Sequence, residues 1–165
     1  MRQILTTLSG DNMTPRLIEL FREYESGHRH PTNQLTHKVA IPVILFHIIA
    51  MLDWIHFGPV FAMATANGDG LRLSAGTLAI VIAGTWYFRN DLRLGAILTV
   101  YMLACLAVGW HTPAGLVVAL AIVGWLIQFS GHYIWEKQHP SFFTNLLQAL
   151  VGPAYFTARL FKFYP

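Results

Sequence analysis

Residues 114–129 read AGLVVALAIVGWLIQF, an uninterrupted apolar stretch that is directly followed by Ser130, Gly131 and His132. Such a stretch is typical of a membrane-spanning helix. Three further apolar stretches precede it, at about residues 39–63, 73–88 and 94–110. Some of the four are shorter than the roughly 20 residues that cross a bilayer, which indicates tilted ends or helices that extend into the interface.

The composition favours a bilayer as the surrounding solvent. Apolar residues make up 55% of the 165 residues and charged residues 12%, and the mean hydropathy is +0.48. A soluble domain of this length could not bury so much apolar surface, whereas a bilayer solvates it. The single cysteine, Cys105, excludes an internal disulfide, and we expect it to be a small packing residue.

The basic residues flank the apolar stretches and form no stripe with interleaved aromatics, which argues against nucleic acid despite a pI near 9.2. With four spans, ten of the eleven Lys and Arg residues fall on one side of the membrane, and only Arg72 falls on the other. The positive-inside rule makes the first side cytoplasmic. We therefore expect both termini in the cytoplasm.

The length fits one domain, and we expect an all-α integral membrane domain over residues 1–165. Residues 14–37 are expected to form an amphipathic surface helix, over 14–26, and a histidine loop. Residues 39–130 are expected to form the four transmembrane helices, the first of which begins near Asn33.

Residues 131–165 are expected to form the carboxy-terminal motif and an interfacial or re-entrant helical tail. The sequence leaves open whether the fourth span continues as a helix to Pro140. Gly152 and Pro153 then divide the tail, because a proline removes a helical hydrogen bond.

Two polar clusters lie on the expected cytoplasmic side. The first contains His28, Arg29, His30, Asn33 and His37, and the second contains Gln128, His132, Glu136, Lys137 and His139. Imidazole binds first-row metals well, and carboxylate can complete the set. If the fourth helix continues, His132, Glu136 and His139 share one face by their i, i+4, i+7 spacing. Although a lone interfacial histidine is usually structural or solvated, five on one side favour a site for one or two metal ions.

The remaining polar residues have plainer interpretations. Arg29, Lys137 and Gln128 are candidates for binding substrate, although either charge could equally reach lipid phosphate. We expect Gly131 to allow close packing beside His132. His111 is expected to be solvated, and three residues of the first span are expected to pair with one another or to lie near the outer interface: His47, Asp53 and His56.

At these clusters the sequence resembles a known family, the membrane-bound 2-hydroxy fatty acid dioxygenases of fungi and bacteria. One part of the resemblance is Tyr24-x3-His28-x-x-Pro31-x-Asn33-x3-His37-x3-Ile41-Pro42. The other is Gln128-Phe129-x-Gly131-His132-x3-Glu136-Lys137-x2-Pro140, which Gly152-Pro153 continues. The resemblance covers both ends of the chain and the four-span layout between them.

The resemblance implies an Fe(II)-dependent α-oxidation at the inner membrane of a bacterium. A long-chain 2-hydroxy fatty acid and dioxygen would give a fatty acid one carbon shorter and carbon dioxide. His28, His37 and His132 fall on the motif histidines and are the expected metal ligands. His30 and His139 depart from the family pattern and rank below them.

Glu136 and Asn33 fall on the motif acid and the motif asparagine, and the resemblance makes them catalytic candidates. Glu136 has three possible roles: metal ligand, partner of a histidine, or base for the hydroxyl proton. The substrate supplies four electrons, enough to reduce dioxygen fully, and the sequence has no Gly-rich dinucleotide fingerprint.

Two other functions stay open. A di-iron lipid hydroxylase or desaturase also uses membrane histidines, but it needs many more of them and an electron donor. A non-enzymatic membrane protein that binds metal or protons would carry polar residues through its spans. The second to fourth spans are nearly free of charge, which argues against a conduction path.

Overall fold

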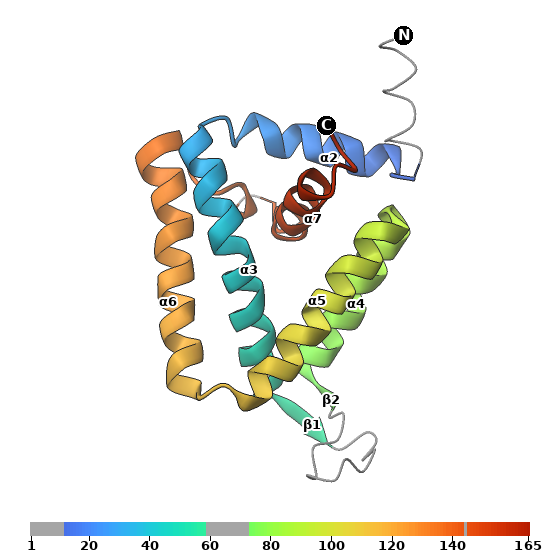
Figure 1. The fold of residues 1–165 in the computed structure, drawn as a ribbon, viewed down its shortest axis with the longest axis vertical. Helices are drawn as coiled ribbons and strands as arrows, with labels where there is room; N and C mark the ends of the chain where they lie inside the picture. Colours follow the sequence, from blue (N-terminus) through green and yellow to red (C-terminus); the bar gives the residue numbers. More distant parts are fainter. Residues whose placement is uncertain (1–11, 59–72, 144) are drawn as a thin grey trace.

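The apolar stretches form four helices, each antiparallel to the next along the chain (Figure 1). They are α3 (Pro31–Asp53), α4 (Ala75–Asn90), α5 (Leu92–His111) and α6 (Ala114–Ser130). The structure is a computed structural model and describes residues 12–58, 73–143 and 145–165. The α3–α6 pair and the α4–α5 pair diverge toward one end, where α2 (Pro15–Ser26) and α7 (Gln148–Leu160) lie (Figure 1). The fold is all-α, as expected, apart from one short strand pair.

Helix α2 begins and ends where the sequence predicts. The Thr14 hydroxyl accepts a hydrogen bond from the Leu17 amide at 3.2 Å, Pro15 occupies the first turn, and Gly27 follows the last residue. The buried face of α2 packs against α7 through Leu17, Leu20, Phe21 and Tyr24. The amphipathic helix is therefore confirmed, and its place at a membrane surface stays a prediction.

Helix α3 begins two residues before the expected start near Asn33. The His30 side chain accepts a hydrogen bond from the Thr32 amide at 3.2 Å and so caps the helix, and Pro31 occupies its first position. A proline is tolerated there because the first amides of a helix have no intrahelical partner.

The expected extension of the first span to about residue 63 is wrong, because α3 ends at Asp53. The buried Asp53 carboxylate accepts hydrogen bonds from the Ser74 hydroxyl and, at 2.8 Å, from Trp110 Nε1. After this anchor the chain turns into strand β1 (His56–Gly58), which pairs antiparallel with β2 (Leu73–Ser74). Residues 59–63 lie outside the described residues.

The second span has the expected 16 residues but lies two residues further along the chain, since Leu73 and Ser74 belong to β2 and the helix runs from Ala75 to Asn90. Its 16 residues extend for roughly 24 Å, less than the ~30 Å hydrocarbon core of a bilayer. Among the described residues, three helices are long and apolar enough to cross a membrane: Pro31–Asp53, Leu92–His111 and Ala114–Glu136. These lengths and compositions indicate a membrane protein.

The fourth helix does not continue to Pro140, so the condition under which His132, Glu136 and His139 would share one face is not met. Helix α6 passes into a π-helix, η1 (Gly131–Glu136), and ends at Lys137, which adopts the left-handed conformation with φ 55°. The wider π-helical turn changes the angular spacing of the side chains. His132 and Glu136 remain in this helix, whereas His139 lies beyond its end.

Gly152 and Pro153 do not divide the tail, because α7 continues through both as one helix. Pro153 lacks an amide proton and costs one helical bond. Packing holds the helix nonetheless: Val151, Ala154 and Ala158 are fully buried, and the Tyr87 hydroxyl donates to the Leu150 carbonyl at 3.1 Å. A short 3-10 turn, η2 (Ser141–Phe143), connects η1 with the residues before α7.

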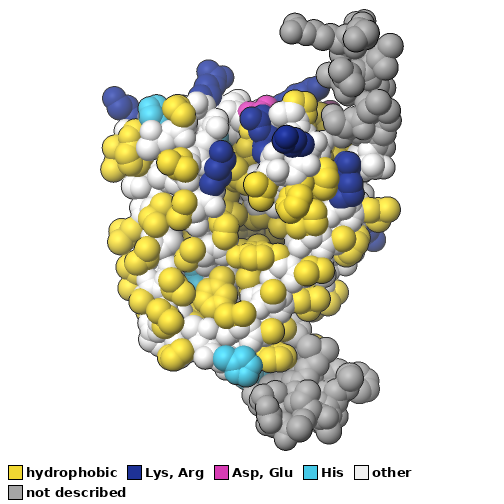
Figure 2. Space-filling model, viewed as in Figure 1, with side chains coloured by type: hydrophobic (Ala, Val, Ile, Leu, Met, Phe, Trp, Pro, Cys, Tyr) yellow, Lys and Arg dark blue, Asp and Glu magenta, His cyan; other side chains and the backbone are white. Residues whose placement is uncertain are grey.

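The surface is apolar along the bundle and basic at one end. In Figure 2, apolar side chains cover most of the visible face, while the Lys and Arg side chains gather at the end where α2 and α7 lie. Large apolar residues on α4, α5 and α6 are well exposed, among them Val81, Val100 and Leu126 at 63%, 67% and 64%. This pattern is that of a helix bundle whose sides face lipid.

Candidate metal centre

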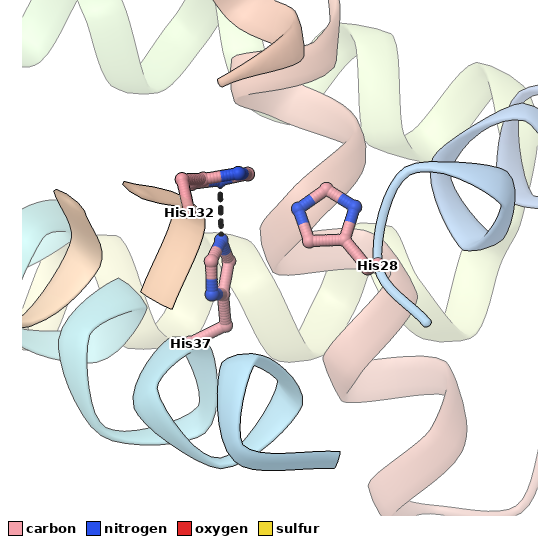
Figure 3. Close-up of side chains that lie close together, drawn as sticks. All are labelled: His28, His37 and His132. Atoms are coloured by element: carbon pink, nitrogen blue, oxygen red, sulfur yellow. Dashed lines mark hydrogen bonds between the residues drawn. The ribbon is translucent and has the colours of Figure 1, made fainter. Parts of the chain in front are cut away.

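Three histidines from distant parts of the chain meet at the basic end of the bundle (Figure 3). His28 lies in the connection between α2 and α3, His37 on the second turn of α3, and His132 in η1. The ring centroids are 4.7 Å apart for His28–His37 and His37–His132 and 5.0 Å apart for His28–His132. All three residues are at most 3% exposed.

Hydrogen bonds to backbone carbonyls orient two of these rings. His28 Nδ1 lies 2.7 Å from the Tyr24 carbonyl, and His37 Nδ1 lies 2.8 Å from the Asn33 carbonyl. Because a carbonyl only accepts, each Nδ1 carries the proton and each Nε2 presents its lone pair as an acceptor. His37 Nε2 is in turn 2.9 Å from His132 Nε2.

The nitrogens of this triad can therefore ligate one ion. One nitrogen from each histidine lies within 4.8 Å of the others, and no Asp, Glu or Cys among the described residues joins the group. Hydrogen bonds from Nδ1 to a backbone carbonyl are a usual way in which proteins orient metal-binding imidazoles. A first-row transition metal suits three imidazole ligands.

Burial favours the form of histidine that binds a metal. Desolvation lowers the pKa of His28 below its ordinary value, against the opposing effects of its bond to the Tyr24 carbonyl and of the Glu136 charge. The Tyr24 ring stacks on His28 with centroids 3.8 Å apart and planes at 9°, and Phe156 packs against both Tyr24 and His37. These aromatic rings keep the imidazoles neutral by excluding water.

Glu136 forms hydrogen bonds between the two segments that carry the histidines. Its Oε1 accepts hydrogen bonds from the His30 amide at 2.6 Å and from Asn33 Nδ2 at 3.2 Å. The carboxylate thus connects η1 to the first turn of α3 without joining the triad. Its two hydrogen-bond partners are a backbone amide and the Asn33 amide, so the choice among the three roles that the sequence left open for Glu136 stays a prediction.

Gly131 is the point of closest approach between η1 and α3. A Cβ atom at Gly131 would collide with Asn33 Oδ1 and Thr36 Oγ1. Only a glycine therefore lets His132 approach His37 this closely, in agreement with the close packing expected beside His132.

A cavity of about 110 Å³ opens beside His28 and His132. Its apolar wall includes Trp125 and a face of α3, and its polar wall includes Gln128 and Gln148, both at most 6% exposed. Gln128 Nε2 lies 2.7 Å from His37 Nε2. A larger groove of about 710 Å³ lies on the other side of α3, between α3, α5 and α7, with His37 in its wall. Figure 2 shows the molecule hollowed near its centre, below the basic side chains.

The other predicted site residues lie outside the triad. His30 caps α3, and His139 is exposed, with its Nδ1 3.4 Å from the Tyr133 hydroxyl. Arg29 and Lys137 are exposed and line neither the cavity nor the groove. Of the three substrate-binding candidates, only Gln128 lies beside the histidines.

The polar residues of the first span do not pair with one another, so of the two alternatives only a place near the outer interface stays open. His47 accepts a hydrogen bond from Trp125 Nε1 at 3.1 Å, Asp53 bonds to Ser74 and Trp110, and His56 is exposed. Buried polar groups find partners on whichever helix packs against them, and sequence spacing does not reveal that helix. His111 is exposed and Cys105 is buried, as expected.

Gln148 is the residue of this site that the sequence interpretation missed. It is the one amide in the apolar run LLQALVGP at 146–153, and this isolation was the available signal. The run was interpreted as a divided interfacial tail, which placed no part of it against the histidines.

The chain was compared with known proteins. The family model described as "2-hydroxy-palmitic acid dioxygenase Mpo1-like" matches residues 15–163. The 2-hydroxy-palmitic acid dioxygenase MPO1 of Saccharomyces cerevisiae is 29% identical over 140 residues, which cover 85% of this chain and 76% of the yeast protein. No solved structure matches the chain.

Proposed function

Since the chain belongs to the 2-hydroxy-palmitic acid dioxygenase Mpo1-like family, we propose that it is a membrane-bound dioxygenase of long-chain 2-hydroxy fatty acids. The reaction is R–CH(OH)–COOH + O₂ → R–COOH + CO₂ + H₂O. The observation that carries the proposal is the buried triad of His28, His37 and His132 beside a largely apolar cavity.

The electron balance of this reaction explains why no reductant is needed. The bond between C1 and C2 breaks, C1 leaves as carbon dioxide, and C2 gains a second and a third bond to oxygen as it becomes the new carboxyl carbon. The substrate loses four electrons, and dioxygen takes up these four. The enzyme therefore needs a site for the acid and a redox-active centre, but no docking site for an electron donor.

The triad fits such a centre. His28 and His37 present Nε2 lone pairs, fixed by the bonds from Nδ1 to Tyr24 and Asn33, and His132 Nε2 faces that of His37. Iron(II) held by these three nitrogens would supply the activation of dioxygen. Asn33 and Glu136 are positioning residues, because their hydrogen bond joins the two segments that carry the histidines.

The chain's own side chains prepare the cavity for the acid. The polar wall, with Gln128, faces the head group, and Ile44, Ile48 and Trp125 form the apolar end for the first carbons of the alkyl chain. Exclusion of water by this wall strengthens every polar interaction inside and protects the reaction from side products.

We place the site on the cytoplasmic side of a membrane that all four long helices cross, α4 included. Two observations support an even number of crossings: His28 and His132 are neighbours, and α4 and α5 are antiparallel over their length. Ten of eleven basic residues then lie on the side of the site.

The test is turnover by the protein purified in detergent. With Fe(II), air and 2-hydroxypalmitate, and without reductant, we expect the 15-carbon acid and carbon dioxide, measured by mass spectrometry. His132→Ala should abolish product formation, while His111→Ala, at the exposed far end of α5, should retain it. A strict need for an electron donor would instead indicate a hydroxylase, and absence of both metal and turnover a non-enzymatic binding protein.

A further inference from the structure

Gln148 is a buried amide without a partner. It is 3% exposed, and neither Oε1 nor Nε2 has a hydrogen-bond partner. The amide would be solvated in the unfolded chain, so burial without a partner destabilises the fold. A native protein that keeps such a group uses it for something other than packing.

The position of Gln148 indicates what the amide meets. It lines the cavity beside His28 and His132, where Gln128 Oε1 is a second buried acceptor without a partner. The lining contains no Lys, Arg, Asp or Glu. An acid that enters this cavity finds amides, imidazoles and the hydroxyls of Tyr24 and Ser141 as its polar neighbours, and no cation.

We infer that the Gln148 carboxamide binds the head group of the substrate, with Nε2 donating to the carboxylate and Oε1 accepting from the 2-hydroxyl. This inference rests on the proposed function, and it identifies Gln148 as the residue that selects the substrate. A 2-hydroxy acid presents an acceptor and a donor on adjacent carbons, which is the complement of one primary amide.

This arrangement gives selectivity for the hydroxyl group. A fatty acid without the 2-hydroxyl would leave Oε1 buried and unpaired, and sites built to bond a substrate hydroxyl discriminate strongly against analogues that lack it. A cation in the same place would bind any carboxylate, and the exposed Arg29 and Lys137 lie outside the cavity.

Hydrogen bonds fix the backbone around position 148. The backbone N–H of Gln148 donates to the Asn145 carbonyl at 2.9 Å. The following turn of α7 is anchored by the bond from the Tyr87 hydroxyl to the Leu150 carbonyl. The backbone that carries Gln148 is thus held in the cavity wall before the substrate arrives, which reduces the ordering cost of binding.

The test compares Gln148→Met with the wild type and with Gln138→Met, a matched change at an exposed glutamine. Dissociation constants for 2-hydroxypalmitate and palmitate are measured by equilibrium dialysis without oxygen, together with bound metal and the thermal midpoint. We expect Gln148→Met to weaken 2-hydroxypalmitate binding roughly ten- to thirtyfold, the effect of two lost hydrogen bonds, and to weaken palmitate binding only about three- to fivefold, because palmitate loses only the bond to its carboxylate.

The thermal midpoint separates a substrate-binding role from a structural one. Because an apolar side chain removes an unsatisfied buried amide, Gln148→Met should keep or raise the midpoint and retain the metal. Gln148→Leu provides a second variant with the same expectation. Wild-type selectivity for the hydroxy acid in both variants would overturn the role of Gln148 while leaving the function intact. Failure of the wild type to bind 2-hydroxypalmitate would overturn the proposed function and, with it, the role of Gln148 in binding this acid.

Discussion

His28 and His37 are oriented by the same local device. Each donates its Nδ1 proton to the backbone carbonyl four residues earlier, that of Tyr24 or Asn33, and so presents Nε2 to the other rings. His132 lacks this device, since its Nδ1 is buried without a partner. The position of His132 therefore depends on the packing of η1 against α3, to which Asn33 and Glu136 contribute.

We predict that Asn33→Ala and Glu136→Ala each weaken metal binding roughly ten- to hundredfold, as loss of a supporting hydrogen bond near a metal site does. The double variant should bind metal about as well as Glu136→Ala alone, because Asn33→Ala removes a hydrogen bond that Glu136→Ala has already removed. Metal titration of the four proteins checks this. Glu23→Ala, at an exposed site on α2, is the control and should bind like the wild type. Full additivity of the two losses would contradict a shared role.

Among the elements, η1 has the greatest influence on the site. A π-helical turn at the end of α6 brings His132 against His37, and it needs a residue without a side chain at its first position. Gly131→Ala should lower the thermal stability by the equivalent of about 1–3 kcal/mol, the usual cost of overpacking, and should weaken metal binding.

The control lies on the same continuous helix. A Cβ at Gly115 would meet nothing within 4 Å, so Gly115→Ala should leave metal binding unchanged and stabilise α6 by up to about 1 kcal/mol. Thermal unfolding monitored by circular dichroism, together with metal titration, distinguishes the two variants. Equal behaviour would mean that η1 tolerates a side chain and that close packing is not what positions His132.

Elements whose limits depend on neighbouring residues could be predicted from the sequence, whereas elements whose limits depend on contacts with distant residues could not. The limits of α2 were predictable because Thr14, Pro15 and Gly27 act on adjacent backbone. The end of α3 was not, because it depends on bonds from Asp53 to Ser74 and Trp110, which are distant in sequence. The π-helical turn has no local signal at all, and α7 survives Pro153 through tertiary packing.

The same distinction holds for the site. The even number of apolar stretches predicted five histidines on one side, the resemblance to the dioxygenase family selected three of them, and the structure brings these three together. The place of Gln148 required knowledge of how α7 packs under α2 and against α3, which composition does not provide.

The whole molecule is expected to cross the membrane four times with both histidine segments in the cytoplasm. In a Cys105→Ala background, single cysteines at exposed Arg29 and Lys137 should react with an impermeant maleimide only from the cytoplasmic side. A cysteine at exposed His111 should react only from the opposite side. Labelling of positions 29 and 137 from opposite sides would rule out a shared site and the fourfold crossing.

The small cavity and the larger groove lead to different predictions for how activity depends on the length of the substrate's alkyl chain. We expect the alkyl chain to begin at the apolar end of the small cavity, so Ile48→Trp should lower kcat/KM for 2-hydroxypalmitate about tenfold more than for a short 2-hydroxy acid. Ile97→Trp, in the larger groove across α3, is the matched control and should leave this ratio unchanged. A changed ratio in Ile97→Trp alone would move the alkyl chain to the groove.

Bound metal per chain, measured by mass spectrometry on detergent-purified protein, decides whether the buried imidazoles form a metal centre. We expect about one iron ion per chain in the wild type and in His111→Ala, as three imidazole ligands require. His28→Ala, His37→Ala and His132→Ala should each lose it while remaining helical and inserted. Retention of a full complement of iron by His132→Ala, or a metal-free wild type after reconstitution with Fe(II), would contradict a metal centre built from these three residues.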